Sequence, residues 1–212
     1  MNDIMSFGLH RFAKKKLVGM SGITSNQTIM DLAGGTGDIS LLFSKVFEES
    51  ARVYLVDINN NMMQIAQERF AKSSSASEVR IIKAFAEQLP FSANSVDCVA
   101  ISFGIRNFTD KGAALQSVHR ILKPGGKIIM CDFSNPQTTF VRSLNKLYFN
   151  QIVPFLSKIL IGDFMNYKYL AESISVHPDQ KQLKVMMEMA GFKNCRYENL
   201  FNGIIALHEG IK

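Results

Sequence analysis

The chain of 212 residues contains few cysteines and histidines, and their positions argue against two kinds of protein. Cys98, Cys131 and Cys195 are odd in number, far apart and embedded in apolar runs, so neither a disulfide framework nor a CxxC metal site is predicted. The four histidines show no spacing typical of metal ligands. We therefore expect no metal, and a reducing compartment such as the cytoplasm.

Long apolar runs are also absent. None reaches the roughly 18 residues of a transmembrane helix, and the start of the chain, MNDIMSFGLHRFAKKK, lacks the hydrophobic block of a secretion signal. These absences predict a soluble protein. The 24 basic residues exceed the 18 acidic ones, which is compatible with nucleic acid, an anionic membrane surface, or no charged partner. The only basic run, Lys14 to Lys16, is also what a solvated helix face would carry.

Among the features that are present, residues 29–40, IMDLAGGTGDIS, are the most informative. They predict an apolar strand that ends near an acid, turns through Gly34, Gly35 and Gly37, and enters a helix. Glycine tolerates positive φ and leaves no Cβ between backbone and ligand. We therefore expect a ligand against this turn, the alternative being a tight strand-to-helix connection that binds nothing.

The spacing in this turn separates two classes of nucleotide cofactor. The dinucleotide fingerprint requires a third glycine at position 40, which is Ser40 in this chain. The order Asp31, Ala33, Gly35, Gly37 instead places small residues at every second position after an acid. This pattern resembles the first motif of the S-adenosylmethionine-dependent methyltransferases, with Ala33 in place of the usual first glycine.

Asp57 supplies a second element of a nucleotide site. It follows the predicted strand RVYLV, about 20 residues after Gly37, where a carboxylate can accept hydrogen bonds from both ribose hydroxyls. The alternative is that Asp57 caps the helix predicted to start near Asn60.

The rest of the chain alternates between strands and helices. The predicted strands are rich in Val, Ile, Leu and Met with little polar alternation, as in strands covered on both faces. We predict an α/β fold with a doubly wound, seven-stranded, mostly parallel sheet and a ligand at the strands' carboxyl ends. The predicted strands are residues 28–32, 52–56, 79–84, 96–102, 127–133, 193–200 and 203–208, and the predicted helices are residues 39–47, 60–72, 112–122 and 180–190.

The last third of the chain departs from this alternation. Residues 138–175 predict an aromatic-rich helical block on the substrate side, interrupted at Pro154 and Gly162. The final two strands are joined by an Asn202-Gly203 turn, which predicts an antiparallel hairpin. We see no repeat and no second domain, and expect one domain over residues 1–212.

Seven segments that run in order along the chain carry a closer resemblance. They are MNDIMSFGLHR (1–11), DLAGGTGD (31–38), AEQLPF (86–91), ISFGIRNFTD (101–110), RILKPGG (120–126), YLAESISVHPDQ (169–180) and NGIIALHEG (202–210). Together they resemble the C-methyltransferase family of ubiquinone and menaquinone biosynthesis over nearly every residue. SFGIRN and YLAESI are more particular to that family than the others.

The resemblance implies an activity and a cofactor. The activity is methyl transfer from S-adenosylmethionine to a ring carbon of a polyprenyl hydroquinol, either a methoxy-polyprenyl-benzoquinol or a demethylmenaquinol. Other readings are a methyltransferase for another small lipophilic substrate and a non-catalytic scaffold in a quinone-synthesis complex. With Gly35 of the turn, the implied cofactor residues are Thr36, Asp57, Phe85, Ala86 and Ser102.

Two positions depart from the family pattern. Phe85 stands where a polar or acidic side chain usually meets the adenine amino group, so recognition of adenine would depend more on the backbone of Ala86. Ala13 stands where a tryptophan is usual, and family members usually carry a further segment before MND. We therefore expect residues 1–27 to form a partial N-terminal lid over the cofactor.

The implied chemistry needs a positive group, because a phenol ring carbon becomes nucleophilic when a hydroxyl loses its proton. Arg106, just past the fourth predicted strand, is expected to stabilise the phenolate, and Asn107 to orient the hydroxyl or a water. Arginine cannot itself accept the proton. The alternative is that Arg106 pairs with Asp110 or caps a loop.

The expected partners follow from the substrate. Residues 138–175 offer an apolar wall to an isoprenoid tail, or a homodimer interface, and a transient contact with a membrane surface fits the basic charge. SFGIRN replaces the DPPY or NPPY signature of amino-group methylation, so no nucleic-acid substrate is expected. The expected location is cytoplasmic, or peripheral at the inner face of the membrane.

Overall fold

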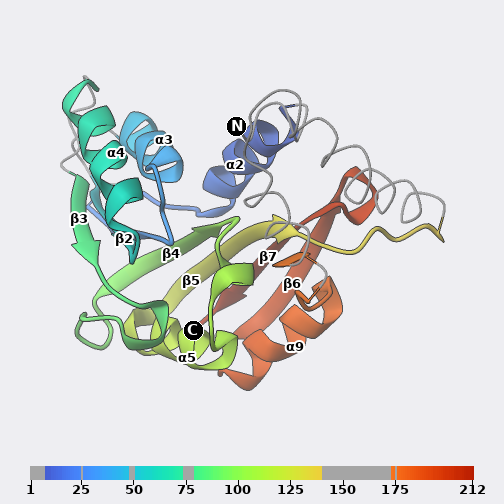
Figure 1. Ribbon diagram of the computed structural model, residues 1–212. Helices are drawn as coiled ribbons and strands as arrows, with labels where there is room; N and C mark the ends of the chain where they lie inside the picture. The colour runs from blue at the N-terminus through green and yellow to red at the C-terminus, as the bar shows by residue number, and fades with distance from the viewer. Residues whose placement is uncertain (1–7, 25, 48–50, 74–78, 140–172, 175) are drawn as a thin grey trace.

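In the computed structural model, the residues described are 8–24, 26–47, 51–73, 79–139, 173–174 and 176–212. Seven strands form one sheet in the order β3-β2-β1-β4-β5-β7-β6 (Figure 1). The strands are β1 Thr28–Leu32, β2 Arg52–Asp57, β3 Val79–Lys83, β4 Val96–Ser102, β5 Leu122–Phe133, β6 Lys193–Leu200 and β7 Ile205–Ile211. The helices are α2 Leu9–Met20, α3 Asp38–Phe47, α4 Asn60–Ala71, α5 Lys111–Ile121 and α9 Gln180–Met189, with short 3-10 turns η2 Ala86–Gln88, η3 Ile105–Asn107 and η5 Phe201–Gly203.

The first five strands pair in parallel, whereas β7 pairs antiparallel with both β5 and β6. Because the order reverses between β1 and β4, the loops after these two strands diverge at a switch point, where ligands of such folds bind. The predicted α/β class, the mostly parallel sheet and the C-terminal antiparallel hairpin are confirmed. Most of the helical block predicted at 138–175 lies outside the described residues.

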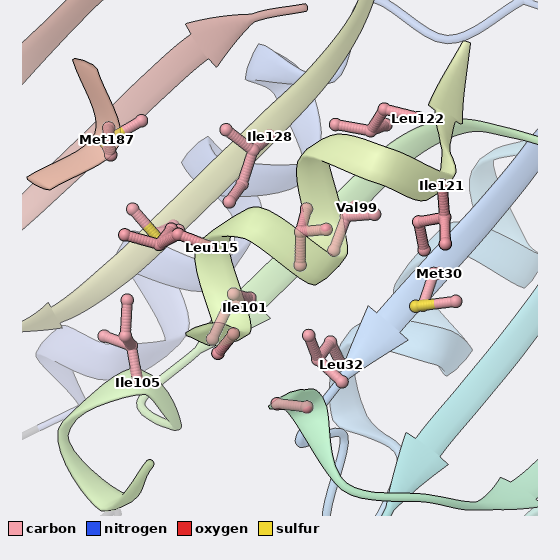
Figure 2. Close-up of a cluster of buried hydrophobic side chains, with 14 of the residues drawn as sticks. Met30, Leu32, Val99, Ile101, Ile105, Leu115, Ile121, Leu122, Ile128 and Met187 are labelled. Atoms are coloured by element: carbon pink, nitrogen blue, oxygen red, sulfur yellow. The ribbon is translucent and has the colours of Figure 1, made fainter. Parts of the chain in front are cut away.

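Helices cover both faces of the sheet, which explains the apolar strand sequences. Figure 1 shows α2, α3 and α4 on one face and α5 and α9 on the other. Successive side chains of a strand point to opposite faces, so Ile129 joins the core under α2 and α3 while Ile128 joins the core under α5 and α9. Figure 2 shows this second core, which includes Leu115 of α5, Met187 of α9 and Val99 of β4.

The boundaries of two predicted elements are wrong. The strand predicted at 127–133 begins at Leu122, because Leu122 already pairs with Val96 of β4. The register between β4 and β5 then shifts, and Gly125 in the KPGG segment has a φ of 78°. The strand predicted at 203–208 is instead Ile205–Ile211. Phe201, Asn202 and Gly203 have φ of 52°, 59° and 87°, so the hairpin connection is a longer left-handed turn and not the predicted two-residue one.

No helix among the described segments is long and apolar enough to cross a membrane.

The basic run Lys14 to Lys16 lies on α2, and the alternative that it forms a solvated helix face is wrong for Lys14. Lys14 is buried against the molecule and pairs with Asp38 at 2.6 Å, so it is not part of a solvated face.

Candidate cofactor and catalytic site

The turn between β1 and α3 needs glycine at two positions for different reasons. Gly35 has φ of +54°, and a Cβ built there would meet no atom within 4 Å, so its backbone is open to a ligand. Gly37 has φ of +82°, and a Cβ there would lie 2.5 Å from the ring of Phe70, because α4 packs against the turn. The first glycine therefore leaves space for a ligand and the second leaves space for a helix.

Asp57, at the end of β2, closes this turn. Its Oδ2 accepts a hydrogen bond from the backbone N–H of Gly35 at 2.8 Å, and its Oδ1 accepts one from Asn59 at 2.9 Å. The cap of α4 is the side chain of Asn59, which accepts from the N–H of Met62, so the alternative that Asp57 caps this helix is wrong. The carboxylate, which is half-buried, remains at the edge where a ribose would meet it.

Asp31 explains why a serine stands where a dinucleotide fold has glycine. Its carboxylate is buried, and its Oδ2 accepts from the backbone N–H of Ser40 at 2.9 Å and from the Ser40 hydroxyl at 2.7 Å. Burial raises the pKa of Asp31 to about 7, although the two bonds from Ser40 lower it. The acid of the motif therefore holds the first turn of α3 from inside the protein.

Thr36 is fixed through its carbonyl. Arg69 of α4 donates to this carbonyl at 2.6 Å and also pairs with Asp38 at 2.7 Å, while Asp38 pairs with Lys14 of α2. Burial opposes the ionisation of Asp38, but Lys14 and Arg69 together hold its pKa below the usual value. Through these three side chains the helix α2, which lies in the predicted lid, is tied to the glycine turn.

The remaining predicted cofactor residues lie after β3 and β4, at the same edge of the sheet. Phe85 is 64 % exposed, and Ala86 is buried at the start of η2. Ser102 ends β4, and its hydroxyl lies 3.3 Å from the sulfur of Cys131 on β5. The structure thus brings these three residues to the edge that also carries Gly35 and Asp57.

Arg106, in η3 after β4, is held by the end of β5. Its NH1 group pairs with Asp132 Oδ1 at 2.8 Å and donates to the carbonyl of Phe103, and its guanidinium lies 5.6 Å from the ring centre of Phe133. Asp110 instead caps α5 by accepting from Ala113 at 2.9 Å, so the alternative pairing of Arg106 with Asp110 is wrong.

Asn107 ends η3 and is exposed, unlike its neighbour. The side chain of Arg106 is only 13 % exposed and that of Asp132 only 3 %. The two predicted catalytic residues are therefore placed differently: Arg106 is in a partly buried ion pair, whereas Asn107 is exposed.

Two residues with left-handed backbone bring the loops after β1 and β4 together. Ala33 and Phe103 both have φ of 55°, a conformation that costs a non-glycine residue about 1–2 kcal/mol. A Cβ at Gly104 would lie 2.6 Å from the Cβ of Ala33, so glycine is needed at that contact. The glycine turn and the loop that carries Arg106 are thus in direct contact.

A model of one protein family matches the sequence of the whole chain. The model, described as the ubiE/COQ5 methyltransferase family, matches residues 1–212. The chain belongs to the ubiE/COQ5 methyltransferase family.

Curated members of this family include proteins named ubiquinone/menaquinone biosynthesis C-methyltransferase UbiE. The one from Haemophilus ducreyi is 45 % identical over 212 residues, covering 100 % of this chain and 82 % of the relative. The one from Klebsiella pneumoniae subsp. pneumoniae is 46 % identical over the same length, covering 84 % of the relative.

Solved structures with the same fold are more distant in sequence. A SAM dependent methyltransferase from Aquifex aeolicus has a TM-score of 0.70 at 17 % identity, covering 96 % of this chain and 92 % of that one. Phosphoethanolamine N-methyltransferase 2 of Haemonchus contortus, in complex with S-adenosyl-L-methionine, has a TM-score of 0.70 at 18 % identity, covering 94 % and 52 %. At this identity the likeness shows the fold alone.

Sequence reasoning about this ubiE/COQ5 member missed three of the charged residues that support the site. Asp132 lies at the carboxyl end of β5 just as Asp57 ends β2, so an acid at a strand's carboxyl end was an available signal. Arg69 and Lys14 carried no such signal, because each reaches Asp38 from a helix far away in the sequence.

Proposed function

We propose that this member of the ubiE/COQ5 family is an S-adenosylmethionine-dependent C-methyltransferase that acts on the ring of a polyprenyl hydroquinol in ubiquinone or menaquinone biosynthesis. The full-length family match and relatives at 45 % and 46 % identity support this function. The observation that carries it is the contact between two loops. One is the glycine turn that Asp57 closes, and the other carries Arg106, which Asp132 holds in place.

The residues present fit the cofactor. Gly35 leaves its backbone open, and Asp57 is ionisable and half-buried at the ribose position. Thr36, Ala86 and Ser102 line the same edge, and Phe85 offers a ring that can pack on adenine but cannot bond to its amino group. When bound, S-adenosylmethionine supplies an electrophilic methyl group on a positively charged sulfur.

Arg106 is the group that stabilises the phenolate in this proposal. A carbon nucleophile forms as the phenolic oxygen loses its proton, and a fixed cation beside that oxygen lowers the barrier. Because Asp132 and the carbonyl of Phe103 hold the guanidinium, its position does not need to be reorganised during the reaction. Asn107, exposed at the same turn, orients the hydroxyl or a water.

The location and the partners belong to the same proposal. We propose that the protein works in the cytoplasm and meets the inner face of the membrane transiently, since a polyprenyl tail partitions into lipid. The wall for the tail, and a homodimer or quinone-synthesis complex, are assigned to residues 138–175, of which 140–172 and 175 lie outside the described residues. The proposed organisation is one domain, with residues 1–27 as a partial lid.

The test is incubation with methyl-labelled S-adenosylmethionine and short-tail demethylated quinols of benzenoid and naphthalenoid type, with products identified by mass. We expect labelled carbon-methylated quinol from at least one ring type. Cofactor binding is measured in parallel by calorimetry. Binding without any quinol product would indicate a methyltransferase for another lipophilic substrate, and no binding would indicate the scaffold role.

A further inference from the structure

His177 is a buried histidine that the mechanism above does not use. It is 7 % exposed, and its Nδ1 atom is shielded from solvent and has no hydrogen-bond partner in the part of the chain that the structure describes. A buried polar atom without a hydrogen-bond partner destabilises the folded state. Such an atom in a native protein requires an explanation, and a ligand that bonds to it during function is one.

The segment around His177 is fixed at the carboxyl end of β5. Gln180, three residues later, accepts from the hydroxyl of Ser134 at 2.8 Å and donates to the carbonyl of Asn135 at 3.1 Å. The backbone N–H of His177 donates to the carbonyl of Ile174 at 3.2 Å, which forms a turn. These contacts place His177 near the carboxyl end of β5, where Asp132 lies.

Charged groups from three elements act on this imidazole. Burial lowers the pKa of His177, the nearby Asp132 of β5 opposes this, and Lys111 of α5 and Arg106 of η3 lower it further. His208 of β7 also faces the cluster, and burial lowers its pKa to about 4. The His177 side chain is therefore neutral at pH 7, which leaves one ring nitrogen able to accept a proton.

The proposed reaction lacks a group of this kind, because the guanidinium of Arg106 cannot accept a proton. We propose that His177 is the proton acceptor for the phenolic hydroxyl of the quinol. This inference rests on the proposed function. It assigns complementary roles to neighbouring residues, with Arg106 stabilising the phenolate and His177 receiving the proton.

The proposed reaction begins with the transfer of the phenolic proton to His177. The O–H bond breaks and its proton moves to Nδ1 of His177, while the oxygen's electron pair makes the ring carbon nucleophilic. The new carbon–carbon bond forms as the carbon–sulfur bond breaks, with its electron pair leaving on sulfur. The ring proton at that carbon is then lost to water, the proton on His177 returns to the oxygen, and one proton is released overall.

The deciding variant is His177→Gln, which keeps a polar side chain but cannot take up a proton. Loss of a general base costs about 10²–10⁴-fold in rate, so we expect kcat to fall at least about 100-fold while the Kd for S-adenosylmethionine, measured by calorimetry, stays within about twofold. The matched control is His119→Gln. His119 lies on α5 and packs on Phe192, outside the proposed machinery, and burial lowers its pKa too.

The pH profile separates a proton acceptor from a merely structural histidine. For the wild type and for His119→Gln we expect kcat/KM to fall at low pH, with a midpoint below the ordinary histidine pKa of about 6.5. For His177→Gln we expect no such fall. A fluorinated quinol, which loses its phenolic proton more easily, should restore much of the variant's rate and change the wild type little.

Two results would overturn this role. One is His177→Gln with wild-type turnover and an unchanged acid limb. The other is a wild-type profile that stays flat between about pH 5 and pH 8, which decides the question even when the variant does not fold. If the wild type methylates no quinol at all, the proposed function fails first.

Discussion

The two halves of the carboxyl edge of the sheet are built by different means. Around β1 and β2, the site consists of backbone groups in a turn that glycines make possible. One carboxylate, that of Asp57, holds this turn by accepting a hydrogen bond from the N–H of Gly35 at 2.8 Å. Around β4 and β5, it is an ion pair between side chains, Arg106 and Asp132, which are 13 % and 3 % exposed. The first half depends on residues that a short motif specifies, and the second on contacts between distant segments.

This comparison predicts that changes to the Arg106–Asp132 pair lower turnover strongly while sparing cofactor binding. The largest effect is expected for Arg106→Lys. Lysine is a point charge and cannot reproduce the planar fork that bonds to Asp132 and to the carbonyl of Phe103. We expect kcat to fall at least about 100-fold, measured with labelled methyl donor, with an unchanged Kd for S-adenosylmethionine.

A matched control for this prediction is Arg120→Lys. Arg120 also donates to two carbonyls, those of Leu89 and Phe91, but it lies near the end of α5, at the opposite edge of the sheet. The turnover of the Arg120→Lys variant should stay near that of the wild type. Equal losses in both variants would mean that the effect of Arg106→Lys is general destabilisation.

In the first half, Asp57→Ala should weaken binding of S-adenosylmethionine about tenfold to a hundredfold, since a hydrogen bond to a charged group contributes about 1.5–3 kcal/mol. The variant also loses the acceptor for the N–H of Gly35. Calorimetry measures the effect. The control Asp97→Ala removes a carboxylate that accepts from Thr28 and Lys123 at the other edge, and an affinity loss of the same size there would contradict the assignment.

A smaller effect is expected in the pH dependence of folding. The pKa of Asp31 is raised from 3.8 to about 7, so its folded form holds a proton that the unfolded chain has lost between these values. Its stabilisation is therefore complete below pH 3.8 and is lost as the pH rises through about 7.

Asp31→Asn removes this titration and can still accept from the N–H of Ser40. Between about pH 5 and pH 7.5 the wild type loses the stabilisation from Asp31, whereas the variant does not. The free energy of unfolding of the variant minus that of the wild type should therefore increase by about 2 kcal/mol over this range. Urea unfolding at the two pH values checks this. A constant difference between the two proteins would show that Asp31 is ionised in the fold throughout.

The smallest effect concerns Phe85, the position that departs from the family pattern. Phe85→Glu introduces an acceptor for the adenine amino group and should tighten S-adenosylmethionine binding about twofold to tenfold, the worth of one hydrogen bond of about 0.5–1.5 kcal/mol. The control Met189→Glu adds the same charge at an apolar residue that is 80 % exposed. Tighter binding in both variants would point to surface charge alone.

The same comparison explains how far sequence reasoning reached. The strand β1 and its glycine turn were predictable because strand, acid and glycines lie within twelve residues, where local backbone rules decide the shape. The role of Ser40 as a partner of Asp31 was not, since it depends on the carboxylate being buried. The burial of Lys14 was also missed, because Asp38, its partner, is 24 positions away.

The site residues divide in the same way. Asp57 and Arg106 could be chosen from their places after apolar strands, since such places meet at one edge of a parallel sheet. The contacts of these two residues could not be predicted. Asn59, not Asp57, caps α4, and Asp132, not Asp110, pairs with Arg106. From the sequence alone, Asp110 and Asp132 are both possible partners of Arg106. Only the packing of the strands and loops brings Asp132 close enough to pair.

The sequence by itself determined the class of sheet, the ligand-binding turn and the acid on the neighbouring strand, because apolar periodicity and glycine act over a few residues. The tertiary structure decided which loops touch, through Ala33 and Gly104, and which charges are paired, through Asp132. It also decided that His177 is buried, with a ring nitrogen that has no hydrogen-bond partner among the described residues. Burial and pairing are properties of the packed chain, since both depend on residues that meet only after the strands have assembled.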